Sequence, residues 1–315
     1  MKFIITGALG HLGSQLIREL PLSFPNCQMV LIDNLSSNHY CSLFNLPHNA
    51  SYHFIEDDVN EAHLDEVIKH ADVIIHLARN KSASIDPEEQ DHIETANFIM
   101  TEKIAHYCSS LHIPFIHLST TDVYGTHVKI IDEYCKPQDL NPQTAMAKNK
   151  LQEETCLQTL STKNPLKFIS LRIAPLFGVT PGMNFTSIIS KLCWQAVLNQ
   201  PLTIERTTYK QKSPYLAVHD AINAICMMIK RNHFDNKIYN VVSVNTTMEE
   251  IIESIRNYIP AIQTIFFDEP RNRFYSGEVK PERLLSLGFT PVVDVKQGIY
   301  DTINLLSQAN SDKAL

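Results

Sequence analysis

A chain of 315 residues, 44% of them apolar, is long enough to bury a large core, either as one domain or as two closely packed ones. Because 27 Lys and Arg face 34 Asp and Glu, the formal net charge is −7, and without a dense basic cluster this argues against nucleic acid and anionic membranes as partners. The seven cysteines are scattered and no apolar run could span a bilayer, so we expect a cytoplasmic protein with reduced thiols and no metal site.

The first half of the chain alternates between short apolar runs and helical patterns. Several of the runs are apolar throughout, as strands buried on both faces of a sheet require. This alternation predicts an α/β protein with a Rossmann-type, doubly wound parallel sheet that is covered by helices on both faces. The runs lie at residues 3–6, 29–33, 52–55, 73–77, 115–118 and 168–171.

After residue 172 the pattern changes, and prolines and glycines interrupt residues 175–182. We therefore divide the chain into a first domain of residues 1–174 and a smaller C-terminal lobe of residues 175–315, part of which returns to the main sheet. The polar tail 307–315 is expected to fray. Further elements are expected as helices near 185–199, 219–231 and 247–258, a strand at 237–242, and two short helices within 281–306.

A glycine-rich turn follows the first predicted strand directly. Gly7, Gly10 and Gly13 are spaced three residues apart, and a helix begins near His11 and Leu12. Glycines at these positions permit a tight turn, close approach of the backbone to a pyrophosphate, and close packing of helix on strand. The free N–H groups at the start of the helix then face the phosphates. The turn predicts a dinucleotide site, with an ordinary strand-to-helix connection as the alternative.

Asp33 ends the second predicted strand, twenty residues after Gly13. A carboxylate at this position can accept hydrogen bonds from the adenosine ribose and repels a 2′-phosphate. No Arg occurs in residues 34–45, so the sequence favours NAD over NADP. The alternative is that Asp33 only caps a turn.

These features resemble the extended short-chain dehydrogenase/reductases, the family of nucleotide-sugar epimerases and dehydratases. Residues 30–37, 57–59, 73–78, 119–125 and 287–291 match landmarks of that family in the same order. The resemblance implies a Rossmann domain that holds NAD and a C-terminal lobe that binds the substrate. Beyond the turn and Asp33, the cofactor residues that it implies are Asn34, Ser36, Asp58, Val59, Leu77, Ala78, Asn97 and Lys150.

The family carries a tyrosine and a lysine four residues apart on one helix face. The lysine holds the nicotinamide ribose, and the tyrosinate takes the proton of a sugar hydroxyl. Aligning residues 142–154 with this motif puts Lys150 at the lysine and Met146 at the tyrosine, and none of the eleven tyrosines has a Lys four residues later. A thioether has no proton to exchange. The expected general base is therefore missing, and such a base is commonly worth about a hundredfold to ten-thousandfold in rate.

The resemblance leaves three groups that could transfer protons instead. Tyr124 belongs to a Val-Tyr-Gly motif near the sugar, and Lys150 could act if its surroundings favoured the neutral amine. Asp122 occupies the position of the carboxylate with which family dehydratases remove the C5 proton, and Thr120 is expected to hold the sugar 4-hydroxyl. Thr121 replaces the acid of the glucose 4,6-dehydratases. Unusual dehydratases with 5,6-unsaturated products resemble the chain more closely, because their active site also departs from the family tyrosine. A turn-capping Asp122 is the alternative.

The resemblance thus predicts an NAD-dependent nucleotide-sugar epimerase or dehydratase that oxidises C4 transiently, with a UDP-sugar as the favoured substrate. The predicted helices near 88–110 and 142–160 are expected to form the seam of a homodimer. Two alternatives stay open: a non-catalytic NAD-binding sensor or partner subunit, favoured by Met146, and a reductase of a non-sugar ketone. The candidate substrate-binding residues are Lys81, Thr120, Asn184, Arg271 and Arg273.

Overall fold

The central feature of the fold is a seven-stranded, all-parallel sheet. The computed structural model describes residues 1–61, 64–81, 86–125, 129–268 and 277–308. The strand order is β11-β7-β5-β4-β1-β2-β3, so the order reverses between β1 and β4. This confirms the predicted Rossmann-type α/β fold. The strands are β1 (Lys2–Thr6), β2 (Gln28–Asp33), β3 (Ser51–Glu56), β4 (Val73–His76), β5 (Phe115–Thr120), β7 (Phe168–Ile173) and β11 (Lys237–Val241).

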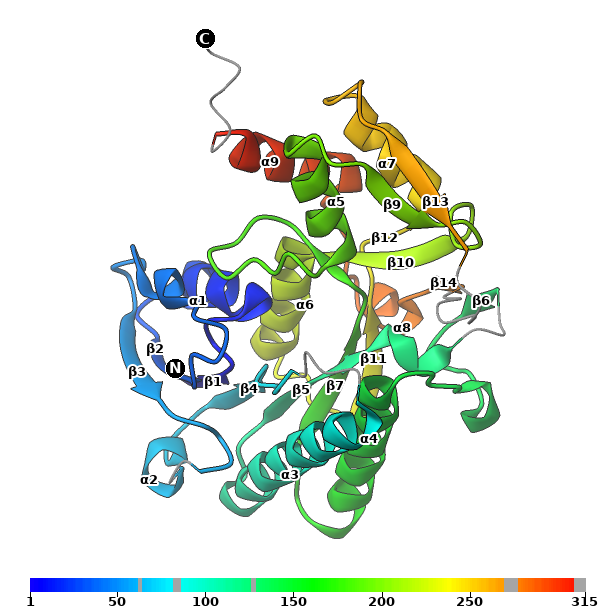
Figure 1. Ribbon diagram of the computed structural model, residues 1–315. Coiled ribbons are helices and arrows are strands. Elements are labelled where there is room, and N and C mark those ends of the chain that lie inside the picture. Colours follow the sequence, from blue (N-terminus) through cyan, green and yellow to red (C-terminus); the bar gives the residue numbers. More distant parts are fainter. Residues whose placement is uncertain (62–63, 82–85, 126–128, 269–276, 309–315) are drawn as a thin grey trace.

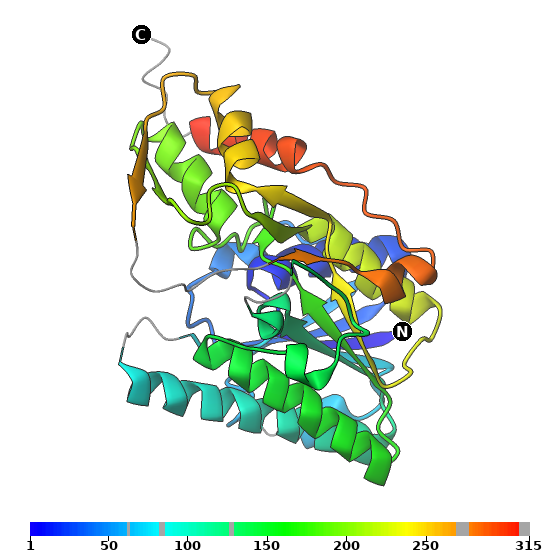
Figure 2. The same ribbon diagram turned by 90° about the vertical axis from the view of Figure 1, so that its right-hand side faces the viewer.

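Helices cover both faces of this sheet (Figure 1). Helices α1 (His11–Ser23) and α6 (Val218–Lys230) lie on one face, and the long helices α3 (Pro87–Leu111) and α4 (Ala145–Lys163) lie side by side on the other, as Figure 2 also shows. Successive residues of a strand point to opposite faces. Accordingly Phe3 packs in the core with α1 and α6, whereas its neighbour Ile4 packs in the core with α3 and α4.

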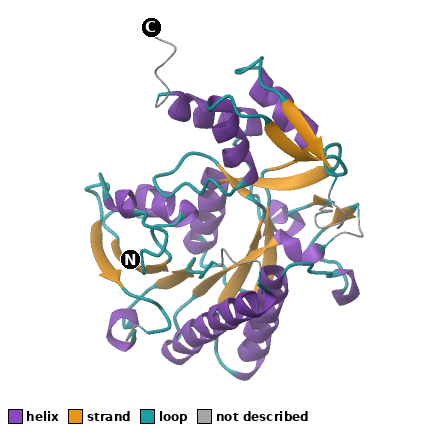
Figure 3. Cartoon of the chain, viewed as in Figure 1, coloured by secondary structure: helices purple, strands orange, loops and turns teal. Residues whose placement is uncertain are grey.

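A smaller lobe follows at the carboxyl edge of the sheet (Figure 3). Helices α5 (Ile188–Val197), α7 (Met248–Arg256) and α9 (Val295–Ser307) enclose a second core together with strands β9 (Leu202–Glu205) and β13 (Thr264–Phe267). The remaining elements are β6 (Ile130–Ile131), β8 (Leu176–Phe177), β10 (Lys212–Ala217), β12 (Val244–Thr247), β14 (Glu278–Val279), α2 (Asp65–Ile68), α8 (Glu282–Ser286), and the 3₁₀ helices η1 (Tyr40–Leu43), η2 (Thr121–Tyr124) and η3 (Pro137–Asp139).

The C-terminal half divides between the two cores. Strand β11, expected at 237–242, joins the main sheet beside β7, and α6 packs with α1 rather than in the lobe. The short strands β8, β10 and β12 pair with one another across distant parts of the sequence, which a local pattern does not reveal. Of the tail 307–315, only the first two residues belong to the described part of the chain. Within the described residues, none of the helices has the length and apolar character needed to cross a membrane.

Candidate functional site

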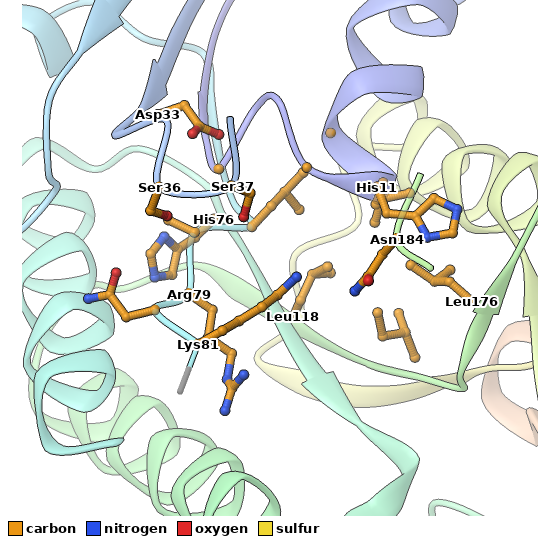
Figure 4. A pocket seen from close by; sticks show the side chains of 18 of the residues that line it. His11, Asp33, Ser36, Ser37, His76, Arg79, Lys81, Leu118, Leu176 and Asn184 are labelled. Carbon is orange, nitrogen blue, oxygen red and sulfur yellow. The ribbon is translucent and has the colours of Figure 1, made fainter. Parts of the chain in front are cut away.

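A cavity of about 450 Å³ opens at the carboxyl ends of β1, β2, β4 and β5, where the strand order reverses (Figure 4). This is the position at which open α/β sheets bind ligands, because the connections on either side diverge there. Residues of the C-terminal half close the cavity from the other side. The predicted site residues that line it are Gly7, Gly10, His11, Leu12, Gly13, Asp33, Asn34, Ser36, Asp58, Val59, Leu77, Ala78, Lys81, Thr120, Asp122, Met146, Lys150 and Asn184.

The glycine-rich turn forms one wall. Gly7 has a φ of +65°, and a Cβ there would lie 2.5 Å from Ala78 N; a Cβ on Gly13 would lie 2.5 Å from Gly7 O. Both positions therefore require glycine. The N-cap residue of α1 is Gly10, which has no side chain with which to cap the helix, and His11, Leu12 and Gly13 of the first turn line the cavity. This wall can bind an anion through backbone groups and the helix dipole.

Asp33 lies at the end of β2, beside the turn. Its carboxylate accepts hydrogen bonds from Leu9 N and Leu35 N, both at 3.0 Å, which fixes its orientation toward the cavity. Asn34 donates from Nδ2 to Asp58 Oδ2 at 2.9 Å and so joins the second and third strand ends. This end of the cavity is acidic, which suits ribose hydroxyls and opposes an additional phosphate.

The opposite end of the cavity carries the predicted catalytic residues. Thr120 Oγ1 accepts a hydrogen bond from Asp122 N at 3.1 Å, so one of its lone pairs is still free to accept from a bound molecule. Burial raises the pKa of Asp122, and the Thr120 hydroxyl opposes this in part. Met146 and Lys150 lie one turn apart on the face of α4 that borders the cavity. The end therefore combines a hydroxyl, a carboxyl, a thioether and an amine.

Tyr124 is not brought to this cavity. Its ring is buried, its hydroxyl donates to Asn240 Oδ1 at 2.7 Å, and the Arg172 guanidinium lies 4.8 Å from the ring centroid. Burial raises the pKa of Tyr124, although Arg172 lowers it. Arg172 is held in turn by both carboxylate oxygens of Glu154. Tyr124 thus belongs to the packing behind the cavity wall, and the proton-transfer role expected for it has no geometric support.

Three other predicted site residues, Asn97, Arg271 and Arg273, are also not among the described residues that line the cavity, for reasons other than that of Tyr124. Asn97 accepts from Asn80 N at 2.8 Å and donates to Asn80 O at 3.1 Å, so it orders a loop that itself lines the cavity. Arg271 and Arg273 lie outside the described residues.

Lys81 extends into the cavity from the loop after β4, and Asn184 faces it from the C-terminal half (Figure 4). In the described part of the chain, no group of three or more His, Cys, Asp or Glu is placed to hold a metal ion.

A model of the NAD dependent epimerase/dehydratase family matches residues 3–241. The chain belongs to this family. The dTDP-D-glucose 4,6-dehydratase of Bos taurus is 24% identical to it over 342 aligned positions, which cover 100% of this chain and 92% of the relative. UDP-glucuronic acid decarboxylase 1 of Danio rerio is also 24% identical, covering 98% of this chain and 73% of the relative.

Solved structures show the same fold. The UDP-glucuronic acid 4-epimerase from Bacillus cereus in complex with UDP-glucuronic acid and NAD has a TM-score of 0.85 at 20% identity, covering 98% of this chain and 100% of that one. The UDP-N-acetylglucosamine 4-epimerase from Methanobrevibacter ruminantium M1 has a TM-score of 0.83 at 22% identity, covering 98% of each chain.

NAD is the cofactor of this epimerase/dehydratase family member, and the residues at the cavity fit it. The two glycines that admit no Cβ leave the first turn of α1 open to a pyrophosphate, and the fixed carboxylate of Asp33 lies where a ribose would accompany it. Bound NAD would supply a reversible acceptor for a hydride.

A fourth glycine of the cofactor region was missed in the sequence analysis. Gly182 belongs to a strap, residues 178–182, that crosses the glycine-rich turn. Its N–H donates to Ser14 Oγ at 2.9 Å, and His11 Nε2 donates to Gly178 O at 3.0 Å. A Cβ on Gly182 would overlap Leu9 O and lie 2.7 Å from Gly10 O. Position 182 of the strap therefore requires glycine. Sequence spacing did not reveal this, because the residues that Gly182 contacts lie about 170 residues earlier.

Gly182→Ala is expected to weaken NAD binding by about tenfold or more and to lower the free energy of unfolding by about 1–3 kcal/mol, because the new methyl must displace the turn or the strap. Isothermal titration with NAD and thermal unfolding measure the two effects. Gly288→Ala is the matched control: Gly288 has a φ of +80°, and the nearest atom to its Cβ, in Arg231, is 3.9 Å away. We expect this control to lose stability but to keep its NAD affinity.

Two further lining residues were not predicted. Ser119 lines the cavity and is 3% exposed, and its buried hydroxyl has no hydrogen-bond partner among the described residues. The buried ring of His76 is held by Thr6, whose Oγ1 lies 2.6 Å from Nδ1 and also accepts from Ala78 N. Burial lowers the pKa of His76 to about 3, so its ring is neutral. The signal for both was their place at the carboxyl ends of parallel strands.

Proposed function

We propose that this family member catalyses the epimerisation or dehydration of a nucleotide sugar, with a UDP-sugar as the favoured class, and uses bound NAD for transient oxidation at C4. One observation carries the proposal. A single cavity joins the glycine-rich turn and Asp33 at one end to Thr120, Asp122 and Lys150 at the other. Proteins of the same fold that were crystallised with UDP-sugars support the choice of substrate class.

In this proposal each residue has a defined task. Lys150 binds the hydroxyls of the nicotinamide ribose through its ammonium. Thr120 Oγ1 accepts a hydrogen bond from the sugar 4-hydroxyl, because the bond from Asp122 N leaves one of its lone pairs free. Once C4 is a ketone, the proton at C5 becomes acidic, and Asp122 removes it in its ionised form. Its raised pKa makes the Asp122 carboxylate a stronger base, and once protonated it can return the proton to C5 or give it to a leaving hydroxyl.

Met146 makes the site atypical. We place it where relatives carry the tyrosine base, one turn before Lys150. The 4-hydroxyl proton then has no phenolate to receive it. In the proposed relay Thr120 Oγ1 accepts it and passes its own proton to Asp122, which releases that proton to solvent before it takes the one at C5. Tyr124 is left out because its hydroxyl is engaged by Asn240.

The second candidate is an NAD-binding sensor or partner subunit without turnover. Met146 favours it, because a protein that no longer performs acid–base chemistry does not need the phenol. The cofactor wall would be the same in both cases. The two functions differ only in whether a nucleotide sugar changes chemically when it meets the NAD-loaded protein.

The deciding experiment incubates the NAD-loaded protein with UDP-, GDP-, dTDP- and CDP-sugars in deuterium oxide. Mass spectrometry and proton NMR then follow loss of water, change of configuration and deuterium at C5. Any of these changes with one sugar supports the enzyme. If NAD binds but every sugar is returned unlabelled and unchanged, the result contradicts the enzyme and supports the non-catalytic sensor or partner subunit.

We also propose a homodimer through the outward faces of α3 and α4. A groove is lined by Phe98 of α3, Leu151 of α4 and Pro142 just before α4, and Ile99, the next residue of α3, is 50% exposed. Sedimentation is expected to give a dimer at micromolar concentration, and Ile99→Glu to shift it to monomer without lowering thermal stability by more than a few degrees. A wild-type monomer under these conditions would contradict the proposal.

A further inference from the structure

The buried carboxylate of Glu153 forms an ion pair with Lys150, whose side chain lines the cavity. Glu153 follows Lys150 by three residues on α4 and is fully buried. Lys150 Nζ donates to Glu153 Oε2 at 2.8 Å, and Asn149 Nδ2 donates to Glu153 Oε1 at 2.9 Å. His117 Nε2, on β5, lies 2.6 Å from the same Oε2. Both oxygens are thus used, and all of these partners are buried.

The charges in this cluster can be assigned from the contacts. Burial lowers the pKa of His117, and its other ring nitrogen lies 2.8 Å from Ser170 Oγ. A neutral ring therefore donates from Nε2 to Glu153 and accepts from Ser170. Burial alone would raise the pKa of Glu153, but Lys150 and the His117 hydrogen bond outweigh it and hold that pKa below its usual range. The cluster holds one anion, Glu153, and one cation, Lys150.

Among the residues that the structure describes, the surrounding elements offer Lys150 no second anion at this contact distance. From β4 the neutral ring of His76 faces the cluster, and from β5 that of His117 does. From α3, Glu94 is bound by Arg79, Asn97 and Asn149. Glu153 is accordingly the sole ion-pair partner of Lys150 among the described residues.

We propose that Glu153 is a positioning residue that keeps Lys150 as a fixed ammonium for cofactor binding and removes it from proton transfer. The proposal rests on the proposed role of Lys150 at the nicotinamide ribose. A buried ammonium next to a carboxylate gains nothing by giving up its proton, because that would leave the carboxylate buried and unpaired. Proton transfer at the sugar then falls to Asp122.

The negative charge of Glu153 also affects how a side chain at the position of Met146 could ionise. A lysine promotes ionisation of a neighbouring phenol only as far as its positive charge is uncompensated. Since Glu153 lies 2.8 Å from the ammonium, it cancels part of that field at position 146. The Glu153 cluster and the absence of a tyrosine at position 146 are therefore consistent with each other, because Lys150 would promote ionisation of a phenol there only weakly.

The test is the pH dependence of NAD affinity in wild type, Glu153→Gln and Glu154→Gln. In Glu153→Gln the buried ammonium loses its counterion, and burial disfavours the charged amine. Its NAD affinity is expected to fall about tenfold or more between about pH 6.5 and about pH 9, while that of wild type changes less than about threefold. Glu154→Gln is the matched control, since Glu154 is equally buried on α4 but pairs with Arg172. It should lose stability and keep the wild-type pH profile.

A flat profile in Glu153→Gln, or the same slope in both variants, would overturn the proposal. If Glu153→Gln does not fold, NMR of the ¹⁵N-labelled lysine ammonium in wild type decides, with Lys150→Met for assignment. A Lys150 signal that titrates between about pH 6.5 and about pH 9 overturns the proposal, and one that stays protonated supports it. None of these measurements uses a sugar. They therefore test the role of Glu153 independently of the proposed catalysis, which only the incubation with nucleotide sugars tests.

Discussion

Asp122→Asn is expected to lower the rate of C5 deuterium incorporation by about a hundredfold to ten-thousandfold, the range usual for loss of a general base. Asparagine keeps the size of the side chain but cannot take a proton. Because burial raises the pKa of Asp122, the wild-type rate should fall toward acid at a higher pH than a free aspartate, near about pH 3.9, would give. This acidic limb should be absent from the residual activity of the variant.

Asp132→Asn is the control for this experiment. Asp132 lies outside the cavity lining and accepts from Tyr134 N at 2.7 Å, a hydrogen bond that an asparagine oxygen can also accept. It should keep the wild-type rate and pH profile, and both variants should keep the affinity for NAD. An Asp122→Asn protein that works within about threefold of wild type would remove Asp122 from the mechanism.

Met146→Tyr is expected to raise the rate of C4 oxidation, followed as NADH absorbance, by about tenfold or more. The new phenol lies one turn before Lys150 on the cavity face of α4, where it can accept the proton of the sugar hydroxyl. The full gain from a general base is commonly about a hundredfold to ten-thousandfold, and the charge of Glu153 should keep this variant below it. Its rate should rise with pH beyond about pH 8, since a phenol without strong support ionises near pH 10.

Met146→Phe separates chemistry from packing. Phenylalanine fills the same space as tyrosine without a proton to exchange, so its rate should stay near that of wild type. If Met146→Tyr and Met146→Phe behave alike, position 146 does not reach the reacting hydroxyl, and the place assigned to Met146 is wrong.

Much of the fold follows from local features of the sequence. All six apolar runs of the first half are strands of the main sheet, and the glycine-rich turn opens α1 as its spacing predicts. Gly7 and Gly13 are required by steric contacts within the first unit of the fold and with the neighbouring strand end. Such features are readable because strand pleat, helix period and turn geometry each depend on a few consecutive residues.

The tertiary structure decided which polar groups face the cavity. Tyr124 and Asp122 stand two residues apart, yet one hydroxyl is bonded to Asn240, 116 residues away, while the other side chain lines the cavity. Gly182 is fixed by the glycine-rich turn at the start of the first domain, and Glu153 by His117 on a different element. The sequence determined the sheet, the helices around it and the phosphate turn, because those are set locally. Only the folded chain determined the partners of Lys150, because a buried charge is set by whatever the packing brings beside it.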